Sequence, residues 1–138
     1  NAAIEADPDY HVAYSNLAHS QQLMATYEIE HGRSPDEWID KGIETSTRSL
    51  QVNPNYYQTY RNLASVFALR AKYELSFGRT APAAAALAKA HEALNQAIKA
   101  NPEDAETHRV LAAVYELEAE TQSAQKQDPQ ELLSRGLQ

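Results

Sequence analysis

The stretch NPNYYQTYRNLASVFA, residues 53–68, decides the fold because a related stretch, DPDYHVAYSNLAHSQQ, occupies residues 7–22. Each stretch has proline at its second position and a Tyr-x-x-Leu-Ala pattern that begins six residues after this proline. A third copy follows Pro102, where the pattern reads His-x-x-Leu-Ala over residues 108–112. The prolines of the three copies are 46 and 48 residues apart. A motif that returns at a nearly constant spacing predicts a chain of tandem structural repeats.

A second proline divides each repeat, because Pro35, Pro82 and Pro129 fall between the copies of the first pattern. Proline suits the first turn of a helix but disrupts a helix interior, so each repeat is predicted to hold two helices. Gly32 and Gly78 lie shortly before two of these prolines and suit a left-handed cap at a helix C-terminus. The predicted helices cover residues 10–31, 36–52, 56–77, 82–100, 103–126 and 130–138.

The composition also favours helices over strands. Hydrophobic residues make up 43% of the chain, many of them are alanine, and only four residues are glycine. Alanine has the highest helix propensity, whereas sheets are enriched in β-branched and aromatic residues. The predicted fold class is therefore all-α.

Charge and residue usage argue against several classes of function. The formal net charge of −7 disfavours nucleic acid as a partner, because phosphate backbones repel an acidic protein. The chain has no cysteine, so it can hold neither a disulfide nor a thiolate metal site. No apolar run approaches the roughly 20 residues that a membrane-spanning helix needs, and residues 1–30 lack a basic leader with an apolar stretch. We expect a cytoplasmic protein with no membrane contact.

Small and large residues alternate at matching places in the repeats. The small positions, which would let neighbouring helices approach closely, are Ala18, Ala64 and Ala112. The large positions beside them, which would fill the space between the helices, are Leu17, Leu63 and Leu111. Helix pairs repeated in tandem bury their apolar faces by stacking on one another. Trp38 is interpreted in the same way, as a core residue rather than an exposed anchor.

The whole pattern resembles the tetratricopeptide repeat family. The resemblance is carried by an aromatic residue, a leucine and a small residue in the first helix, followed by alanines, a large apolar residue and a closing proline in the second. The matching positions are Tyr60, Leu63, Ala64, Phe67, Ala90, Leu94, Ala97 and Pro102. The resemblance implies a right-handed solenoid of antiparallel helix pairs. Because the usual repeat has 34 residues, a spacing of 46 to 48 implies lengthened helices.

The resemblance implies that residues 1–138 form a single domain. Residues 1–8 resemble the tail of a preceding repeat, and the repeats cover 9–54, 55–102 and, incompletely, 103–138. We therefore expect a fragment of a longer protein, or a chain that packs its open ends against another copy. Long-period arrays of this kind are similar to regions beside the catalytic domain of some bacterial serine/threonine protein kinases, which implies a signalling role.

A search for catalytic motifs finds none. The sequence lacks a glycine-rich phosphate loop, a GxSxG motif, an HExxH motif and the kinase signatures. Its five histidines are not spaced as metal ligands. Glu116, Glu118 and Glu120 alternate along one helix, so they are interpreted as a solvated face rather than an acid/base pair. We expect no enzyme activity, no metal and no cofactor in this chain.

The family resemblance implies a concave surface, lined by the first helix of each repeat, that binds a peptide or a partner helix. Carried over by position, the candidate binding residues are Ser15, Asn16, His19, Gln58, Arg61, Asn62, Ser65, Lys72 and Arg109. Asn16 and Asn62 match asparagines that hold a peptide backbone in the family. Arg61 and Arg109 either bind a carboxylate or phosphate of the partner, or form ion pairs with nearby acids of the chain.

The expected partner is a protein or peptide, and an acidic or phosphorylated segment fits the basic residues. The family's carboxylate clamp for acidic C-terminal peptides is not reproduced, because Ser15 replaces a clamp lysine and His19 replaces an asparagine. An alternative function is a structural spacer or self-association element that stacks through its open ends. End-capping substitutions at Leu132 and Leu133 would test that alternative.

Overall fold

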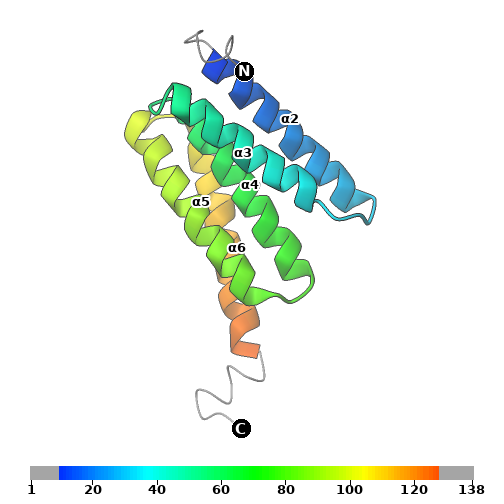
Figure 1. Cartoon of the computed structure of the whole chain (residues 1–138). Helices are drawn as coiled ribbons and strands as arrows, with labels where there is room; N and C mark the ends of the chain where they lie inside the picture. Colours follow the sequence, from blue (N-terminus) through cyan, green and yellow to red (C-terminus); the bar gives the residue numbers. More distant parts are fainter. Residues whose placement is uncertain (1–9, 128–138) are drawn as a thin grey trace.

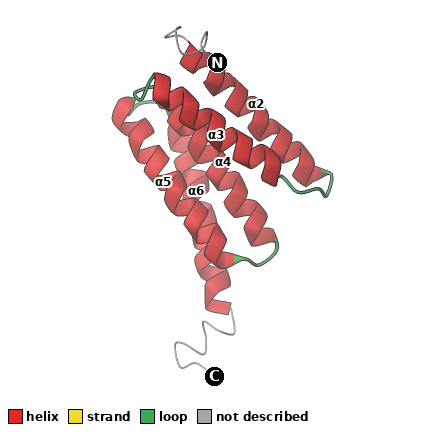
Figure 2. Cartoon of the chain, in the orientation of Figure 1, coloured by secondary structure: helices red, strands yellow, loops and turns green. Residues whose placement is uncertain are grey.

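The computed structural model describes residues 10–127 (Figures 1 and 2). Within this range it contains five α-helices and no strand, which confirms the all-α prediction. The helices are α2 (Tyr10–Glu30), α3 (Asp36–Val52), α4 (Tyr57–Ser76), α5 (Thr80–Ala100) and α6 (Ala105–Gln127). The predicted tail at residues 1–8 and the predicted helix at 130–138 lie outside the described residues.

The C-termini of α2 and α4 are closed by the same motif. Gly32 and Gly78 have φ values of 70° and 71°, in the left-handed region that favours glycine. The next residue in each case is an arginine whose N–H donates to the carbonyl of a glutamate five residues earlier, at 2.8 Å for Arg33 and 3.0 Å for Arg79. This is the Schellman arrangement, and it confirms the role predicted for both glycines.

The starts of the later helices differ by two residues from the prediction. Helix α5 begins at Thr80, before Pro82. A proline there costs little, because the first four N–H groups of a helix have no partner within the helix. Helix α6 begins at Ala105 because Asp104 caps it. The Asp104 carboxylate accepts hydrogen bonds from the backbone N–H and the hydroxyl of Thr107, at 3.0 and 2.7 Å.

Consecutive helices run antiparallel, and α4 lies at the centre (Figure 1). It contacts α2, α3, α5 and α6. The main pairs are α2 with α3 and α4 with α5, each joined by a short loop (Figure 2). Helices α2, α4 and α6 run in the same direction, with α4 in contact with both of the others (Figure 1). The first helices of the three predicted repeats therefore lie next to one another.

The main core lies between α4, α5 and α6 and is built largely from alanine. Its buried residues are Ala64, Ala71, Ala83, Ala86, Leu87, Ala90, Ala93, Leu94 and Val114. Partly buried side chains, among them Leu63, Phe67 and Leu111, pack against this cluster. Many small residues allow the helix backbones to approach closely, and the few large ones fill the remaining space.

The predicted alternation of small and large residues is only partly correct. Ala18 and Ala64 are fully buried, and Leu63 and Leu111 pack against the core as predicted. Leu17, however, is 48% exposed, and Ala112 is exposed. Both predictions were wrong for the same reason, because these residues lie on sides of α2 and α6 that no described helix covers.

A second, smaller core lies between α2, α3 and α4. Its fully buried members are Ala25, Ile39 and Val66, and Trp38 packs against them, as predicted for a core residue. Here α3 buries Thr45, Ser46 and Ser49, which are polar. Ser46 occupies the position equivalent to Leu94 of the main core, which follows it by one repeat spacing of 48 residues. The core of the first helix pair is therefore more polar than that of the second. Among the described residues, the buried oxygens Gln21 Oε1 and Ser46 Oγ have no hydrogen-bond partner.

The acidic residues of α6 do not form one solvated face. Glu116 and Glu120 are exposed, as expected, but Glu118 is half-buried. Its Oε1 atom lies 2.7 Å from Nε2 of His91 on α5. Glu118 therefore contributes to the contact between α5 and α6.

Candidate functional site

Two adjoining hollows lie along α2, α4 and α6, and together they are called the groove. The larger hollow, of about 570 Å³, is lined by Ser15, Asn16, His19, Ser20, Gln22, Gln58, Arg61, Asn62, Ser65, Glu106 and Val110. The smaller hollow, of about 310 Å³, shares four of these residues and adds Ala68, Leu69, Lys72, Arg109 and Ala113. The shared residues are Gln22, Ser65, Glu106 and Val110. The groove therefore crosses all three helices.

The groove brings together all of the residues that the sequence suggested for partner binding. The larger hollow holds seven of them, and Lys72 and Arg109 line the smaller one. These residues meet because equivalent positions of a repeat, on parallel neighbouring helices, face the same side of the molecule. Their contact with a partner stays a prediction.

Asn62 uses its amide to join α4 to α2. Its Nδ2 group donates to the backbone oxygen of Ser15 at 3.3 Å and to the Ser15 hydroxyl oxygen at 3.0 Å. Ser15 is only 2% exposed, so it forms the floor of the groove rather than its accessible surface. Within the described residues the Asn62 amide oxygen has no hydrogen bond, so it is the atom of this pair that a ligand could use.

Arg61 holds the groove together at its α4–α6 side. Its Nη1 atom lies 3.0 Å from Asp104 Oδ2, and both side chains are largely buried, with 21% and 17% exposed. The same carboxylate caps α6 through Thr107. These hydrogen bonds from Thr107 and the Arg61 guanidinium lower the pKa of the Asp104 carboxyl, because both stabilise its ionised form. Arg61 is thus the cation of a capping network between two helices.

The other two basic residues of the groove are more accessible. Arg109 Nη1 lies 2.6 Å from Glu106 Oε2 on the same helix, with the arginine side chain 75% exposed. Both arginines of the groove are therefore paired with acids of the chain, which is one of the two alternatives that the sequence left open. Lys72 is exposed and forms no ion pair within residues 10–127. Exposed ion pairs contribute little to stability, so Arg109 can change partner at small cost.

Removal of the Asp104 carboxylate should destabilise the chain. Asp104→Ala deletes the α6 cap and leaves Arg61 without its acid, and we expect a loss of about 1 to 2 kcal/mol in the free energy of unfolding at pH 7. Because the folded-state pKa is lowered, the contribution is complete above the ordinary aspartate pKa of about 3.9 and disappears as the pH falls through the lowered value. Urea denaturation at pH 7 and at pH 2 measures both effects.

The matched control for this prediction is Asp36→Ala. The Asp36 side chain lies at the start of α3 and is 60% exposed. Its loss should change the free energy of unfolding by less than about 0.5 kcal/mol. Equal urea midpoints for Asp104→Ala and the unmodified chain at pH 7 would contradict the capping role.

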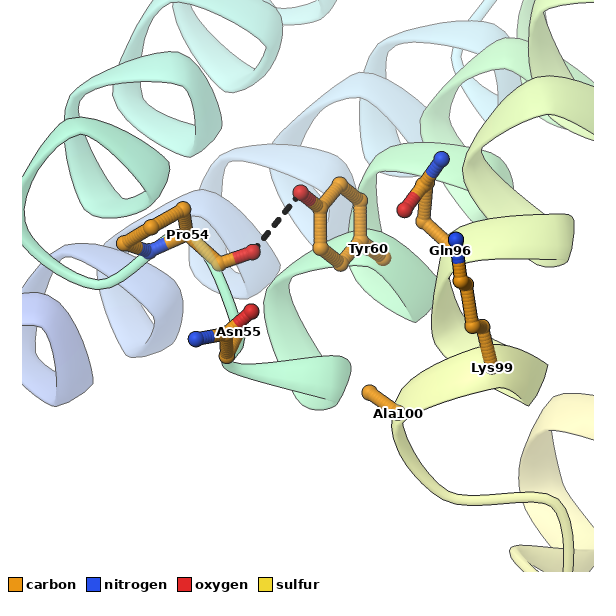
Figure 3. Close-up of a pocket in the computed structure, with 6 residues that line it drawn as sticks. All are labelled: Pro54, Asn55, Tyr60, Gln96, Lys99 and Ala100. Carbon is orange, nitrogen blue, oxygen red and sulfur yellow. Dashed lines mark hydrogen bonds between the residues drawn. The ribbon is translucent and has the colours of Figure 1, made fainter.

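A further pocket, of about 320 Å³, lies where α4 begins and α5 ends (Figure 3). Its lining residues are Pro54, Asn55, Tyr60, Gln96, Lys99 and Ala100. Figure 3 shows the Tyr60 hydroxyl donating to the Pro54 carbonyl, at 2.8 Å. At the next joint, Nε2 of His108 lies 2.7 Å from the Pro102 carbonyl. The sequence did not predict this pocket, but the repeated contact explains why either tyrosine or histidine can occupy this position of the motif.

Metal binding, membrane crossing and similarity to known proteins are each relevant to what this chain can do. The described residues contain no group of three or more histidine and acidic side chains that could hold a metal ion. None of the five described helices is long and apolar enough to cross a membrane. Comparison with family models, with curated proteins and with solved structures found no match to the chain.

Proposed function

We propose that the chain is a protein-protein interaction module of the tetratricopeptide-repeat type, a solenoid of lengthened helix pairs whose groove holds an extended segment of a partner. The observation that carries the proposal is the meeting of all nine candidate residues in two adjoining hollows. The antiparallel pairing of α2 with α3 and of α4 with α5 is compatible with this architecture. So is the burial of equivalent alanines, Ala18 and Ala64, in successive repeats.

The chemistry of the groove favours an extended and acidic or phosphorylated segment. Asn16 offers its side-chain amide, and Ser65 its hydroxyl oxygen, for pairing with a peptide backbone. The Gln58 amide also lines the larger hollow, where it bonds with the hydroxyls of Tyr56 and Tyr57. Lys72 and Arg109 lie together in the smaller hollow and can bind a carboxylate or a phosphate. An anionic group of the ligand would replace Glu106 as the ion-pair partner of Arg109. One exposed ion pair is then exchanged for another.

The basic residues of the groove differ in how well they suit a mutational test. Charge reversal at Arg61 would place two acids side by side at the α6 cap, so it would destabilise the fold as well as the groove. Lys72 and Arg109 have no such structural role. They are therefore the residues whose reversal reports on binding alone.

The combination of Lys72→Glu and Arg109→Glu should weaken binding of an acidic peptide at least about tenfold, because each lost charged contact is worth about 1 kcal/mol or more. The probe is the peptide that binds best after selection of a random and phosphorylated peptide library on the unmodified chain. Binding is measured by fluorescence anisotropy, and thermal unfolding should not change.

The matched control reverses two basic residues of α3, Lys41→Glu with Arg48→Glu. Both form exposed ion pairs four residues away on their own helix, as Arg109 does three residues away. The control has the same net charge as the groove variant, so long-range electrostatics are equal in the two. The proposal fails if the library yields no binder, or if the groove variant and the control bind the selected peptide equally well.

The self-association alternative has one supporting observation, which is the exposed apolar surface of α2. Leu132 and Leu133, which the sequence suggested as end-capping positions, lie outside the described residues. The cytoplasmic location and the association with a kinase stay predictions from the sequence.

A further inference from the structure

Helix α2 lies at the edge of the molecule (Figure 1). It exposes an apolar surface. Its members, here called the α2 outer face, are Val12, Leu17, Leu23, Met24 and Tyr27, with exposed fractions between 38% and 56%. At 3.6 residues per turn these side chains fall within one side of the helix, opposite the buried Ala18 and Ala25. The exposed side of a surface helix is normally polar, so this face is unusual.

The charged group that lies against the α2 outer face comes from outside the helix, since the Arg33 guanidinium is 5.5 Å from the centre of the Tyr27 ring. Residues 10–27 contain no aspartate, glutamate, lysine or arginine, although the chain as a whole carries a net charge of −7. Two copies of such a chain repel each other over most of their surfaces. They can approach through α2 without placing like charges together.

Equivalent positions in the other repeats are packing positions. Ser20, at the middle of the α2 outer face, corresponds to Val66 of α4 and Val114 of α6, at spacings of 46 and 48 residues. Val66 and Val114 are 1% and 0% exposed because preceding helices cover them. Within residues 10–127, no helix covers the same side of α2. This side of α2 therefore corresponds to a helix-packing surface on which no helix of the described residues packs.

We propose that the α2 outer face packs antiparallel against the same face of a second copy, about a two-fold axis near Ser20. Small and large residues are placed symmetrically about that position. Ala13 and Tyr27 are seven residues to either side, so each Ala13 lies against Tyr27 of the partner copy. Leu17 and Met24 lie along the same edge of the α2 outer face, three residues before and four residues after Ser20. Each Leu17 therefore lies against Met24 of the partner copy. A face that is self-complementary in this way suits a closed dimer, the commonest form of oligomer.

The interface and the groove overlap at Ser20 and at Asn16, which lies about one helical turn before it. Ser20 lines the groove, whereas none of the five apolar residues of the α2 outer face does. Substitution of the apolar residues therefore tests the dimer and leaves the groove intact. Because one helix face per copy buries less than a standard interface of roughly 1,200 to 2,000 Å², we expect a dissociation constant in the micromolar range.

Analytical ultracentrifugation at protein concentrations from about 1 µM to about 300 µM spans that range. The unmodified chain should shift from monomer to dimer. Leu17→Glu alone and Met24→Lys alone should each be monomeric throughout, because each places two unpaired charges in the apolar contact. The two substitutions combined in one chain should restore the dimer, because each introduced carboxylate then lies against the introduced ammonium of the partner copy.

A cross-linking experiment tests the axis directly, because the chain has no cysteine. Helices in contact lie about 8 to 10 Å apart, which brings Cα atoms on the axis within the range of a disulfide. Ser20→Cys should therefore form a covalent dimer on mild oxidation. The control is Thr47→Cys on α3, an exposed position with the same hydroxyl bond to the carbonyl four residues earlier.

A chain that stays monomeric at the highest concentration would overturn the proposal. So would equal cross-linking at positions 20 and 47, or a double variant that stays monomeric while its circular dichroism is unchanged. Should Leu17→Glu reduce the helix content, Ser20→Cys decides alone, since it alters the surface least. None of these results depends on a groove ligand, so the dimer can fail while the interaction module stands, and the reverse.

Discussion

Replacement of Leu94 by alanine is expected to lower the free energy of unfolding by about 3 kcal/mol. Leu94 is fully buried in α5 and belongs to the core that α4, α5 and α6 share. Its neighbours are mostly alanines, whose short side chains cannot move into the space that the leucine leaves. The cavity therefore stays open and adds to the lost hydrophobic burial. Guanidinium or urea denaturation, monitored by circular dichroism, measures the change.

The control for Leu94 is the equivalent position of the preceding helix pair, Ser46. Ser46 is fully buried and its hydroxyl oxygen has no partner among the described residues. Ser46→Ala should change the free energy of unfolding by less than about 1 kcal/mol, because an unpaired buried hydroxyl contributes no hydrogen bond. An equal loss at the two positions would contradict the difference between the two cores.

A charge at Val66 should have an effect at least as large. Val66 is 1% exposed and packs between the two helix pairs, against Ala25 and Ile39. The space is tight, since a Cβ atom added to Gly42 would lie 3.4 Å from Val66 Cγ2. Val66→Asp would bury a carboxylate without a cation, so we expect a loss of about 3 kcal/mol or more in the free energy of unfolding.

Hydrogen exchange can show where this loss falls. In the Val66→Asp chain, amides of α2 and α3 should exchange faster, because the contact of this pair with α4 is broken. Val66→Thr, which keeps the shape without the charge, should lose only about 1 to 2 kcal/mol. If Val66→Asp leaves exchange in α2 and α3 unchanged, the junction between the helix pairs is not where the structure puts it.

The helix boundaries could be predicted because particular residues mark them. Gly32 and Gly78 are at the left-handed caps that their type suits, and Pro35 directly precedes α3. The common face of the candidate binding residues could also be predicted, since a repeat carries equivalent positions to equivalent places. These features depend on local chemistry and on periodicity, which a single sequence contains.

Contacts that depend on which residues of the chain lie nearby after folding could not be predicted. Leu17 matches Leu63 in the repeat, yet only Leu63 packs against a described core. Arg61 and Arg109 occupy equivalent positions, but Arg61 joins the α6 cap whereas Arg109 pairs along its own helix. Asp104 was placed inside the helix predicted at 103–126, so its role as the cap of α6 was missed. Such differences arise because neighbours in space are not neighbours in sequence.

The groove is tested most directly by mapping a bound peptide with two-dimensional NMR on the isotope-labelled chain. The peptide is the one selected from the random and phosphorylated library. We predict shifts of the backbone and side-chain amides along the groove, at Asn16, His19, Gln58, Arg61, Ser65, Lys72 and Arg109. Shifts confined to the exposed sides of α3 and α5, with those seven residues unmoved, would contradict the proposed function.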